Sequence, residues 1–485
     1  MLLAASLALS LSAAPACVEI LSLSDLHGRV DALPRVAAEI APVRARGPSL
    51  LLDAGDSAQG TVEASLSRGD AVVAGLAALG VDAAALGNHD LDFGQEAARR
   101  RIAAAPYPTL AANLRDARTR RLPDWKNLDE GRIFRLTGGP VVGVFGLSTP
   151  STPRQTMPAN TEGLRFGKLA AEAERQARSL RARGAELVVG LVHAGGSCRD
   201  PGPPDDLSTC DPRGELLSLA RALPAGLVDG MVGGHTHGFL SHRVNGVALL
   251  QAGSKGQAVG WLTLCVGQPA RFHPPVRPGD DKGGGALAED PKVRAAVAPY
   301  LAAADAERQR LVGVRLELPL ARGRDRVSPL GATAAQAVRS AMGAEIGLVN
   351  AGALRASLPA VDLRYGQLYE AMPFDDGLAV VRMSGANLVA VLSALSSFRK
   401  EVPQVAGIVR DGASTRTCSG LPIDPARTYT VAMNEFLAEG GDGLRGVLSR
   451  LPAGSKIVRG DLRLRDATIA WLRTAPKAQR GLPCP

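Results

Sequence analysis

Short apolar runs alternate with helical patterns along the first half of the chain, and each run is followed by polar or charged residues. The apolar runs cover residues 20–23, 50–52, 83–86, 141–145, 187–192 and 227–232. Runs of this length, separated by helix-length segments, predict strands that alternate with helices in a layered α/β domain. Because ligand residues of open α/β sheets collect at the carboxyl ends of the strands, the loops after these runs should converge on one edge.

A cluster of Gly, Pro and charged residues interrupts this pattern. Residues 267–287 read GQPARFHPPVRPGDDKGGGAL, which indicates a domain boundary. A long helical pattern follows over residues 290–312, with Pro291 near its start and Gly313 just past its end. We therefore expect an export signal over residues 1–16, a first domain over 17–270, a linker with a connecting helix over 271–313, and a second domain over 314–485.

The N-terminal segment has the composition of a secretory signal. It reads MLLAASLALSLSAAPA, an apolar stretch that ends in small residues before a cleavage position at Cys17. The stretch is too short to span a bilayer, and no other segment has a transmembrane pattern. Since the segment carries no Lys or Arg, a buried first strand is the alternative interpretation. Cys17, directly after the cut, also leaves a lipid anchor open.

Length, charge and aromatic content narrow the class of protein. Single cores stop growing at roughly 250–300 residues, so 485 residues indicate two domains. The net charge of +9 fits a solvated basic surface or, alternatively, steering of anionic substrates. Aromatic residues make up only 4%, and no basic run is interleaved with them, which argues against nucleic-acid binding.

The cysteines favour an oxidising compartment. Cys198 and Cys210 bracket the loop sequence RDPGPPDDLST, and outside the cytoplasm this predicts a disulfide that closes a surface loop. Cys418 with Cys484 is a second candidate pair.

Histidines concentrate in the loops after the apolar runs. Of seven histidines, five lie there: His27, His89, His193, His235 and His237. Singly, each has another explanation, such as a hydrogen-bonded core side chain. Together with Asp25, Asp56 and Asn88 they predict a metal site. Mixed carboxylate and imidazole ligands suit Zn, Mn, Co or Fe better than Ca. A carboxylate can bridge two such ions about 3.5–4 Å apart, which together act on a phosphoryl group.

The order and spacing of these motifs resemble the calcineurin-like metallophosphoesterases, and among them the 5′-nucleotidase and UDP-sugar hydrolase family. The motifs are Asp25-Leu26-His27-Gly28, Gly55-Asp56, Gly87-Asn88-His89-Asp90, Val192-His193 and Gly234-His235-Thr236-His237. The first is preceded by Ser24, where the family usually has Thr. The resemblance covers nearly the whole chain after the signal. It implies a four-layer α/β/β/α metallophosphoesterase domain, a connecting helix, and a smaller α+β nucleotide-binding domain of the 5′-nucleotidase C-terminal type.

The resemblance also implies roles for single residues. The metal ligands would be Asp25, His27 and His237 for one divalent ion, Asn88, His193 and His235 for the other, and Asp56 as the bridge. His89 would not be a ligand. It would contact the phosphate and stabilise the transition state, held in orientation by Asp92.

In the second half, a loop motif resembles the family's substrate pattern N-x-G-G-I-R. It begins at Asn350 and ends at Arg355, which would grip a phosphate through its planar fork of donors. Ala351 and Ala353 replace family glycines, which could tighten or displace this loop. Arg324 is a second candidate for phosphate binding, although Arg322 and Arg326 lie close by in the chain.

Two phenylalanines resemble the aromatic clamp that holds a nucleobase. Phe374 is one, and Phe436 begins the second motif, in which Asp442 would hydrogen-bond ribose hydroxyls. Stacking is worth roughly 1–3 kcal/mol per base, although core packing is the alternative for each ring alone. Asp375-Asp376 stands where relatives often carry Gly-Asn. Because an ionised Asp accepts but cannot donate, we hypothesise that Asp376 favours base edges that offer donors.

These patterns predict an exported enzyme that releases phosphate from nucleoside 5′-monophosphates with two divalent ions. The alternative substrates are nucleotide-sugar diphosphates such as UDP-sugars, or 2′,3′-cyclic nucleotides. A third possibility is a nucleotide-binding protein without turnover, which loss of a ligand or of His89 would indicate. All seven ligand candidates and His89 are present.

Overall fold

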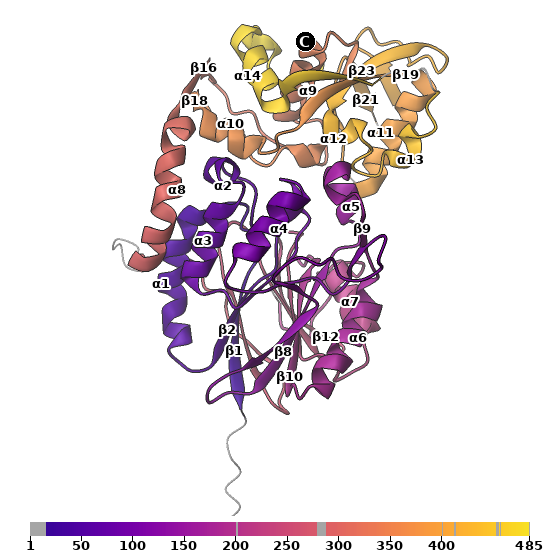
Figure 1. Cartoon of the computed structure of the whole chain (residues 1–485). Helices are drawn as coiled ribbons and strands as arrows, with labels where there is room; N and C mark the ends of the chain where they lie inside the picture. The colour runs from indigo at the N-terminus through magenta and orange to yellow at the C-terminus, as the bar shows by residue number, and fades with distance from the viewer. Residues whose placement is uncertain are drawn as a thin grey trace, which may run out of the picture.

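The computed structural model describes residues 16–199, 202–278, 288–399, 401–411, 414–452, 455 and 457–484. It has a larger first domain, on which the smaller second domain sits as a cap (Figure 1). The expected export signal, apart from Ala16, lies outside the described residues.

Two sheets pack face to face in the first domain. The strands of one are β1 (Cys17–Leu23), β2 (Ser49–Asp53), β3 (Ala83–Ala85), β4 (Thr109–Leu110), β6 (Leu128–Asp129), β14 (Gly260–Cys265) and β15 (Arg271–Phe272). Those of the other are β7 (Gly131–Arg135), β8 (Val141–Ser148), β10 (Leu187–His193), β11 (Gly230–Gly233), β12 (Phe239–Val244) and β13 (Val247–Ala252). Apolar side chains of both sheets, among them Ile20 and Val189, are buried between them.

The strand orders are β15-β14-β1-β2-β3-β4-β6 and β12-β13-β11-β10-β8-β7. Within them β1, β2 and β3 run parallel to one another, as do β8, β10, β11 and β13. Near-continuous apolar runs suit these strands, because parallel sheets are buried on both faces. A small separate pair is formed by β5 (Leu114–Asp116) and β9 (Leu164–Phe166).

Helices cover the outer face of each sheet, which completes the expected α/β/β/α order. The first sheet is covered by α1 (Leu33–Arg44), α3 (Asp70–Leu79) and α8 (Pro291–Gln309), the second by α6 (Leu169–Ala182) and α7 (Glu215–Ala222). Three further helices lie toward the second domain: α2 (Val62–Leu66), α4 (Gln95–Ala104) and α5 (Thr152–Gln155) (Figure 1).

The second domain is built on one mixed sheet. Its strands, in spatial order, are β20 (Gln404–Ala406), β17 (Ile346–Val349), β23 (Thr428–Asn434), β19 (Gly377–Ser384) and β24 (Ile457–Arg463). One face packs on α9 (Pro329–Ala341) and α14 (Leu464–Thr474), the other on α11 (Gly385–Arg399) and α12 (Glu435–Ala438). The remaining elements are α10 (Tyr365–Ala371), α13 (Arg445–Leu448) and the pairs β16 (Leu311–Arg315) with β18 (Asp362–Arg364) and β21 (Ile408–Asp411) with β22 (Ser414–Thr417).

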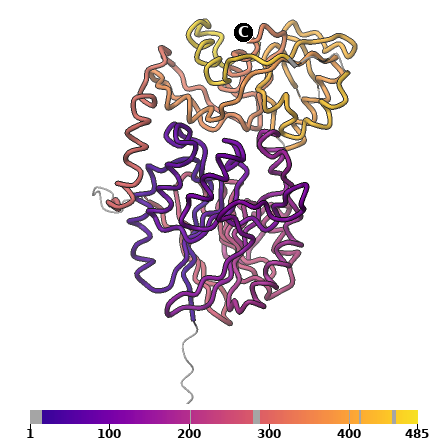
Figure 2. Tube along the Cα trace, viewed as in Figure 1, coloured from indigo at the N-terminus to yellow at the C-terminus, as the bar shows by residue number. Residues whose placement is uncertain are grey.

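Helix α8 connects the domains, as the tube in Figure 2 makes visible. It begins at Pro291, where the Asp290 side chain accepts a hydrogen bond from the backbone amide of Val293. It ends at Gln309, earlier than the sequence pattern suggests, because the chain turns into β16 from Leu311.

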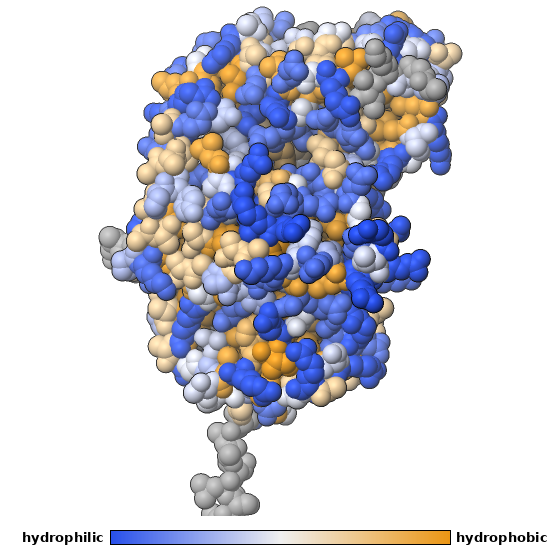
Figure 3. All heavy atoms as spheres, viewed as in Figure 1, coloured by the Kyte–Doolittle hydropathy of each residue, from blue (hydrophilic) through white to orange (hydrophobic). Residues whose placement is uncertain are grey.

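Polar contacts also cross directly between the domains. Gln59 Nε2 donates to the carbonyl of Pro373 at 2.7 Å, and Arg29 pairs with Glu370 at 3.0 Å. Hydrophilic side chains cover much of the face in Figure 3, including the level at which the domains meet.

Three disulfides use all six cysteines: Cys17–Cys265, Cys198–Cys210 and Cys418–Cys484. The last two are the pairs that the sequence suggests. The first corrects one alternative, because the sulfur of Cys17 is bonded to Cys265 and cannot carry a lipid. In the part of the chain that the structure describes, no helix combines the length and the apolar character needed to cross a membrane.

Candidate active site

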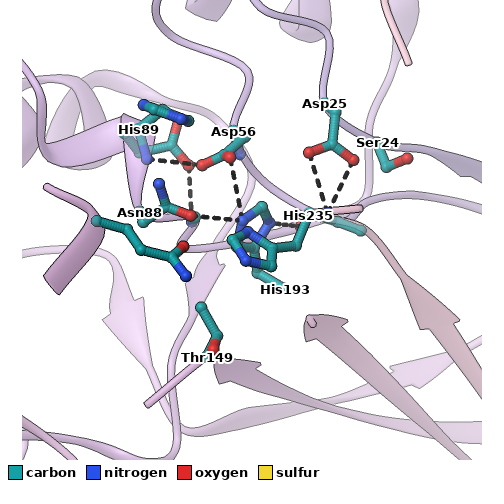
Figure 4. Close-up of polar contacts among 12 residues, drawn as sticks. Ser24, Asp25, Asp56, Asn88, His89, Thr149, His193 and His235 are labelled. Atoms are coloured by element: carbon teal, nitrogen blue, oxygen red, sulfur yellow. Dashed lines mark hydrogen bonds and ion pairs between the residues drawn. The ribbon is translucent and has the colours of Figure 1, made fainter. Parts of the chain in front are cut away.

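The carboxyl ends of the parallel strands bring the predicted ligand residues together. Asp25 follows β1, Asp56 follows β2 and Asn88 follows β3. From the facing sheet, His193 is the last residue of β10, and His235 follows β11. These side chains point toward one another at the shared edge of the sheets (Figure 4).

The backbone of this edge is held in an unusual conformation. Five of the predicted ligand residues have left-handed backbone angles: Asp25 (φ 50°), His27 (φ 48°), Asp56 (φ 57°), His235 (φ 73°) and His237 (φ 58°). Such a conformation costs of order 1–3 kcal/mol per non-glycine residue and persists only where surrounding contacts impose it. Two such contacts involve carboxylates: Asp25 accepts the backbone amide of His235 at 3.0 Å, and Asp56 accepts that of His89 at 2.7 Å.

One group of ligand atoms comes from Asp25, His27 and His237, whose donor atoms all lie within 4.8 Å of one another. The Nε2 atoms of the two histidines are 3.0 Å apart, and His237 Nε2 lies 3.5 Å from Asp25 Oδ1. His27 Nδ1 faces the carbonyl of Gln59 at 3.1 Å and must donate to it, since a carbonyl only accepts. That bond leaves the lone pair of Nε2 for the centre of the group.

A second group comes from Asp56, His193 and His235, again within 4.8 Å. His193 Nδ1 donates to the carbonyl of Ala54 at 2.8 Å. Its Nε2 faces Asp56 Oδ2 at 3.1 Å and Asn88 Oδ1 at 3.2 Å. Asn88 is thereby placed beside the second group, as the resemblance implies.

The donor set of both groups fits divalent cations. Lone pairs of imidazole and carboxylate face each other at hydrogen-bond distance, so a positive charge is needed between them. Burial, with help from Arg355, holds the pKa of His27 well below its usual range, and burial and His27 do the same for His237. Neutral imidazoles are the form that binds metal.

In the second group a proton can take the place of a cation. Burial opposes charge on both partners, but Asp56 outweighs it and raises the pKa of His193 to about 10. In return His193 holds the pKa of Asp56 well below its usual range, against the effect of burial. Burial raises the pKa of Asp25 to about 7.

His89 stands beside the metal groups but points to a different partner. Its Nδ1 lies 2.7 Å from Asp92 Oδ2. The ring centroid of His89 is 5.4 Å from that of His27 and also 5.4 Å from that of Phe374 in the second domain. His89 therefore lies where the two domains meet, with its orientation fixed by the Asp92 carboxylate.

A cleft of about 220 Å³ opens between the domains at this point. The predicted substrate residues that line it are Asn350, Arg355, Phe374, Asp376, Phe436 and Asp442, together with His89 and Asp92 from the first domain. The sequence does not single out Gln59, Gln155 and Asn160, which also line it. These are plain loop and helix amides, and no motif distinguishes them in the sequence.

The ring of Phe436 needs a glycine next to it. A Cβ on Gly441 would lie 2.4 Å from the ring, so any side chain there would displace it. Phe436 is only 8% exposed and also packs in the core of the second domain, so core packing and cleft lining coexist at this residue.

Arginines gather in an adjoining cavity of about 490 Å³, which the metal groups also line. The cavity contains Arg355, Arg324 and Arg322. Arg355 Nη2 lies 3.3 Å from His27 Nε2, whereas Arg324 pairs with Glu401 at 2.7 Å. Arg322 donates to the carbonyl of Arg355 at 2.6 Å. The sequence could not choose between these closely spaced arginines, and Arg322 is a lining residue that it does not assign.

Sequence profiles of two known families match the chain. The calcineurin-like phosphoesterase profile matches residues 18–239, and the 5′-nucleotidase C-terminal domain profile matches residues 307–449. Each profile matches most of one domain.

Individual relatives agree with these profiles. Protein UshA of Yersinia enterocolitica is 26% identical over 450 residues, which is 82% of this chain and 79% of that protein. The 5′-nucleotidase of Vibrio cholerae is 25% identical over 453 residues, 83% of this chain and 79% of that protein. The crystal structure of a 5′-nucleotidase precursor from Thermus thermophilus superimposes with a TM-score of 0.79 at 25% identity, covering 94% of this chain and 96% of that one.

Proposed function

Because the chain belongs to the calcineurin-like phosphoesterases that carry a 5′-nucleotidase C-terminal domain, and is a hydrolytic phosphoesterase, we propose that it releases phosphate from nucleoside 5′-monophosphates. One observation carries this proposal: His89 borders both the interdomain cleft, which Phe374, Phe436 and Asp442 line from the second domain, and the adjoining cavity, which Asp56, His235 and His237 of the metal groups line. A phosphate and a nucleoside would thus be held from opposite domains.

Two divalent ions would be held by Asp25, His27 and His237 and by Asn88, His193 and His235, with Asp56 between them. When bound, such ions supply Lewis-acid chemistry, because they acidify a coordinated water and neutralise charge on phosphate oxygens. The protein's own part is to keep the imidazoles of His27 and His237 neutral and the backbone fixed before the substrate arrives.

The remaining residues would bind and orient the substrate. Arg355 would hold phosphate oxygens through its guanidinium. His89, with Nδ1 bonded to Asp92, would present its other nitrogen to the phosphate, where a protonated ring donates to developing negative charge. Phe374 and Phe436 would stack on the base, and Asp442 would accept hydrogen bonds from ribose hydroxyls.

The test is hydrolysis of AMP, GMP, UMP, UDP-glucose, 2′,3′-cyclic AMP and p-nitrophenyl phosphate, with Mn, Zn or Co and with chelator, followed by separation of the products. We expect metal-dependent turnover that is fastest on a nucleoside 5′-monophosphate. Turnover confined to p-nitrophenyl phosphate or the cyclic nucleotide would contradict the assignment of the second domain. Tight nucleotide binding without turnover under any metal would contradict the enzymatic proposal.

The adjoining cavity favours a second candidate, a nucleotide-sugar diphosphate. Its volume of about 490 Å³ and its lining of Arg322, Arg324 and Arg355 provide room and positive charge beyond the first phosphate. UDP-glucose hydrolysed with a higher kcat/KM than UMP would establish this candidate over the first.

We also infer export from the cytoplasm. The support is the apolar segment of residues 1–16 together with three disulfides, which persist in oxidising compartments. Expression with the native N-terminus, followed by fractionation and N-terminal sequencing, tests this: a mature chain starting at Cys17 outside the cytoplasm is expected, and an intact cytoplasmic chain would contradict it.

A further inference from the structure

A chain of hydrogen-bonded side chains runs beneath the second-domain wall of the cleft. Asn350 Nδ2 donates to Asp442 Oδ2 at 2.8 Å. Asn434 Nδ2 donates to Asn350 Oδ1 at 3.2 Å and to Asp376 Oδ2 at 3.1 Å. Asn350, Asp376 and Asp442 line the cleft, whereas Asn434 is fully buried behind them and does not line it.

The direction of every bond in this chain follows from its two ends. Ionised carboxylates only accept, so when Asp442 and Asp376 are ionised the amide nitrogens of Asn350 and Asn434 must face them. The oxygen of Asn350 is then left for Asn434. One amide group, that of Asn434, thus determines the orientation of two branches: one leads to Asp376, and the other, the ribose branch, leads through Asn350 to Asp442.

Sheet register explains why these residues meet. Asn434 is the last residue of β23, and it pairs with Leu378 of β19, two residues after Asp376. On its other side β23 runs parallel to β17, which ends one residue before Asn350. The carboxyl end of β23 therefore places Asn434 between the two loops that carry the cleft residues.

We propose that Asn434 is a positioning residue that fixes Asp376 and, through Asn350, Asp442. A nucleoside would then bind to the base-facing and the ribose-facing carboxylate in one fixed arrangement. This inference rests on the proposed function, since it assumes that a nucleoside occupies the cleft. Asn434 carries out no chemistry and touches no reacting atom.

The contribution of Asn434 to the stability of the fold does not by itself explain why an asparagine occupies this position. Asn434 Oδ1 is buried and has no hydrogen-bond partner within the described part of the chain. A buried acceptor without a partner is unfavourable, so folding by itself gives no reason for this amide oxygen. The amide nitrogen, in contrast, serves both branches.

The experiment compares the wild type with N434L, N434D and the double variant N434D/D376N. Each is assayed for kcat and KM on AMP and on p-nitrophenyl phosphate, which has no ribose or base. Loss of hydrogen bonds to a charged group should raise the KM for AMP about tenfold or more in N434L and N434D. The kcat for both substrates should change by less than about twofold, because the metal groups and His89 are untouched.

The double variant provides the rescue. N434D alone sets two carboxylates against each other, which should displace Asp376. In N434D/D376N the amide that D376N introduces can donate to the carboxylate that N434D introduces. The KM for AMP should then fall part of the way toward the wild-type value, because the contact at position 376 is restored whereas the carboxylate of N434D cannot donate to Asn350 Oδ1.

A second readout addresses the ribose branch. In the wild type, dAMP should bind more weakly than AMP, because Asp442 loses a hydroxyl partner. In N434L this penalty should shrink, since Asp442 is no longer held by a fixed Asn350. Circular dichroism and thermal unfolding establish that each variant is folded.

Three results would overturn the inference. One is an unchanged KM for AMP in folded N434L and N434D. Another is an equal loss on AMP and p-nitrophenyl phosphate, which would indicate general structural damage. The third is a wild type that hydrolyses p-nitrophenyl phosphate but no nucleotide, which would overturn the proposed function and this inference with it, and which the wild-type assay alone identifies.

Discussion

His89 makes three contacts that place it in the site. It is bonded to Asp92, its backbone amide is held by Asp56, and its ring lies next to Phe374 of the other domain. We expect H89A to lower kcat on AMP by roughly 10²–10⁴-fold, because one proton-donating group to the phosphate is lost. Metal binding, measured by calorimetry, should stay within about twofold because His89 is outside both ligand groups.

A matched control for this prediction is H273A. His273 stacks on Trp261, with ring centroids 3.9 Å apart, away from the cleft. Its removal should leave kcat within about twofold. A comparable loss of kcat in both variants would contradict a specific role for His89.

At Asp376, burial raises the pKa to about 7, and the charges of Asp92, Glu435 and Asp375 act in the same direction. The side chain is therefore protonated below about pH 7 and a pure acceptor above it. If it accepts from base edges, the KM for AMP should fall as the pH rises from 6 to 8.

This pH dependence should disappear in D376N, and the relative rates on AMP, CMP and UMP should shift away from bases with exocyclic amines. The measurement is KM against pH for each nucleotide, with p-nitrophenyl phosphate as a reference for the pH dependence of the metal site. Identical profiles and identical base preference in the wild type and D376N would reject the hypothesis.

The residues of the metal groups were accessible to sequence reasoning, whereas others in the cleft were not. Asp25, Asp56 and His193 follow buried apolar runs, and that position predicts their convergence without knowledge of the fold. Asn434 also ends a strand, but its importance lies in sheet register between β17, β19 and β23, which the sequence does not reveal. Arg322 and Arg324 differ by two positions in a loop, where no periodicity assigns a direction.

At the scale of elements, helix α8 has an N-terminal capping interaction whose contribution to stability can be measured. The Asp290 side chain accepts from the amide of Val293, and the buried Val293 and Val297 fix the helix to the first domain. We expect D290A to lower the free energy of unfolding by about 1 kcal/mol, because a helix amide loses its partner. Thermal and denaturant unfolding measure this loss.

D290N keeps a capping side chain and serves as the control, with an expected change of a few tenths of a kcal/mol. Equal destabilisation by D290A and D290N would show that the charge of Asp290, and not its cap, is what matters.

The strands show where a pattern specifies an element and where it does not. The runs at residues 50–52 and 187–192 correspond to β2 and β10, because a continuous apolar stretch fits a strand buried on both faces. The run at 227–232 starts too early, since Leu227 and Val228 precede β11, which begins at Gly230. Two-residue strands such as β4 and β6 are too short for any periodicity, so only their neighbours in the sheet define them.

For the whole molecule, metal should act as a ligand of the folded state. The two ligand groups place lone pairs and carboxylates against one another, and a bound cation removes that repulsion. At a free metal concentration of about 100 times Kd, one site should stabilise the fold by about 2.7 kcal/mol. We expect chelator to lower the unfolding temperature and Mn, Zn or Co to restore it.

D25N removes the charge of one ligand from the group of Asp25, His27 and His237, and it reaches the second group only through the amide of His235, which Asp25 accepts. Elemental analysis should find two ions per wild-type chain and fewer in D25N, with a smaller thermal shift. An unfolding temperature that none of these metals changes would contradict the assignment of both groups.

The Cys17–Cys265 disulfide encloses all seven ligand candidates, from Asp25 to His237, within one covalent ring of chain. Protease nicks inside such a ring cut the backbone without separating its pieces. A single cleavage in one of the surface loops between these cysteines should therefore yield a protein that migrates as one species without reductant and as two fragments with it. In a protease-rich environment, the metal-binding half would survive such cuts as an assembled unit.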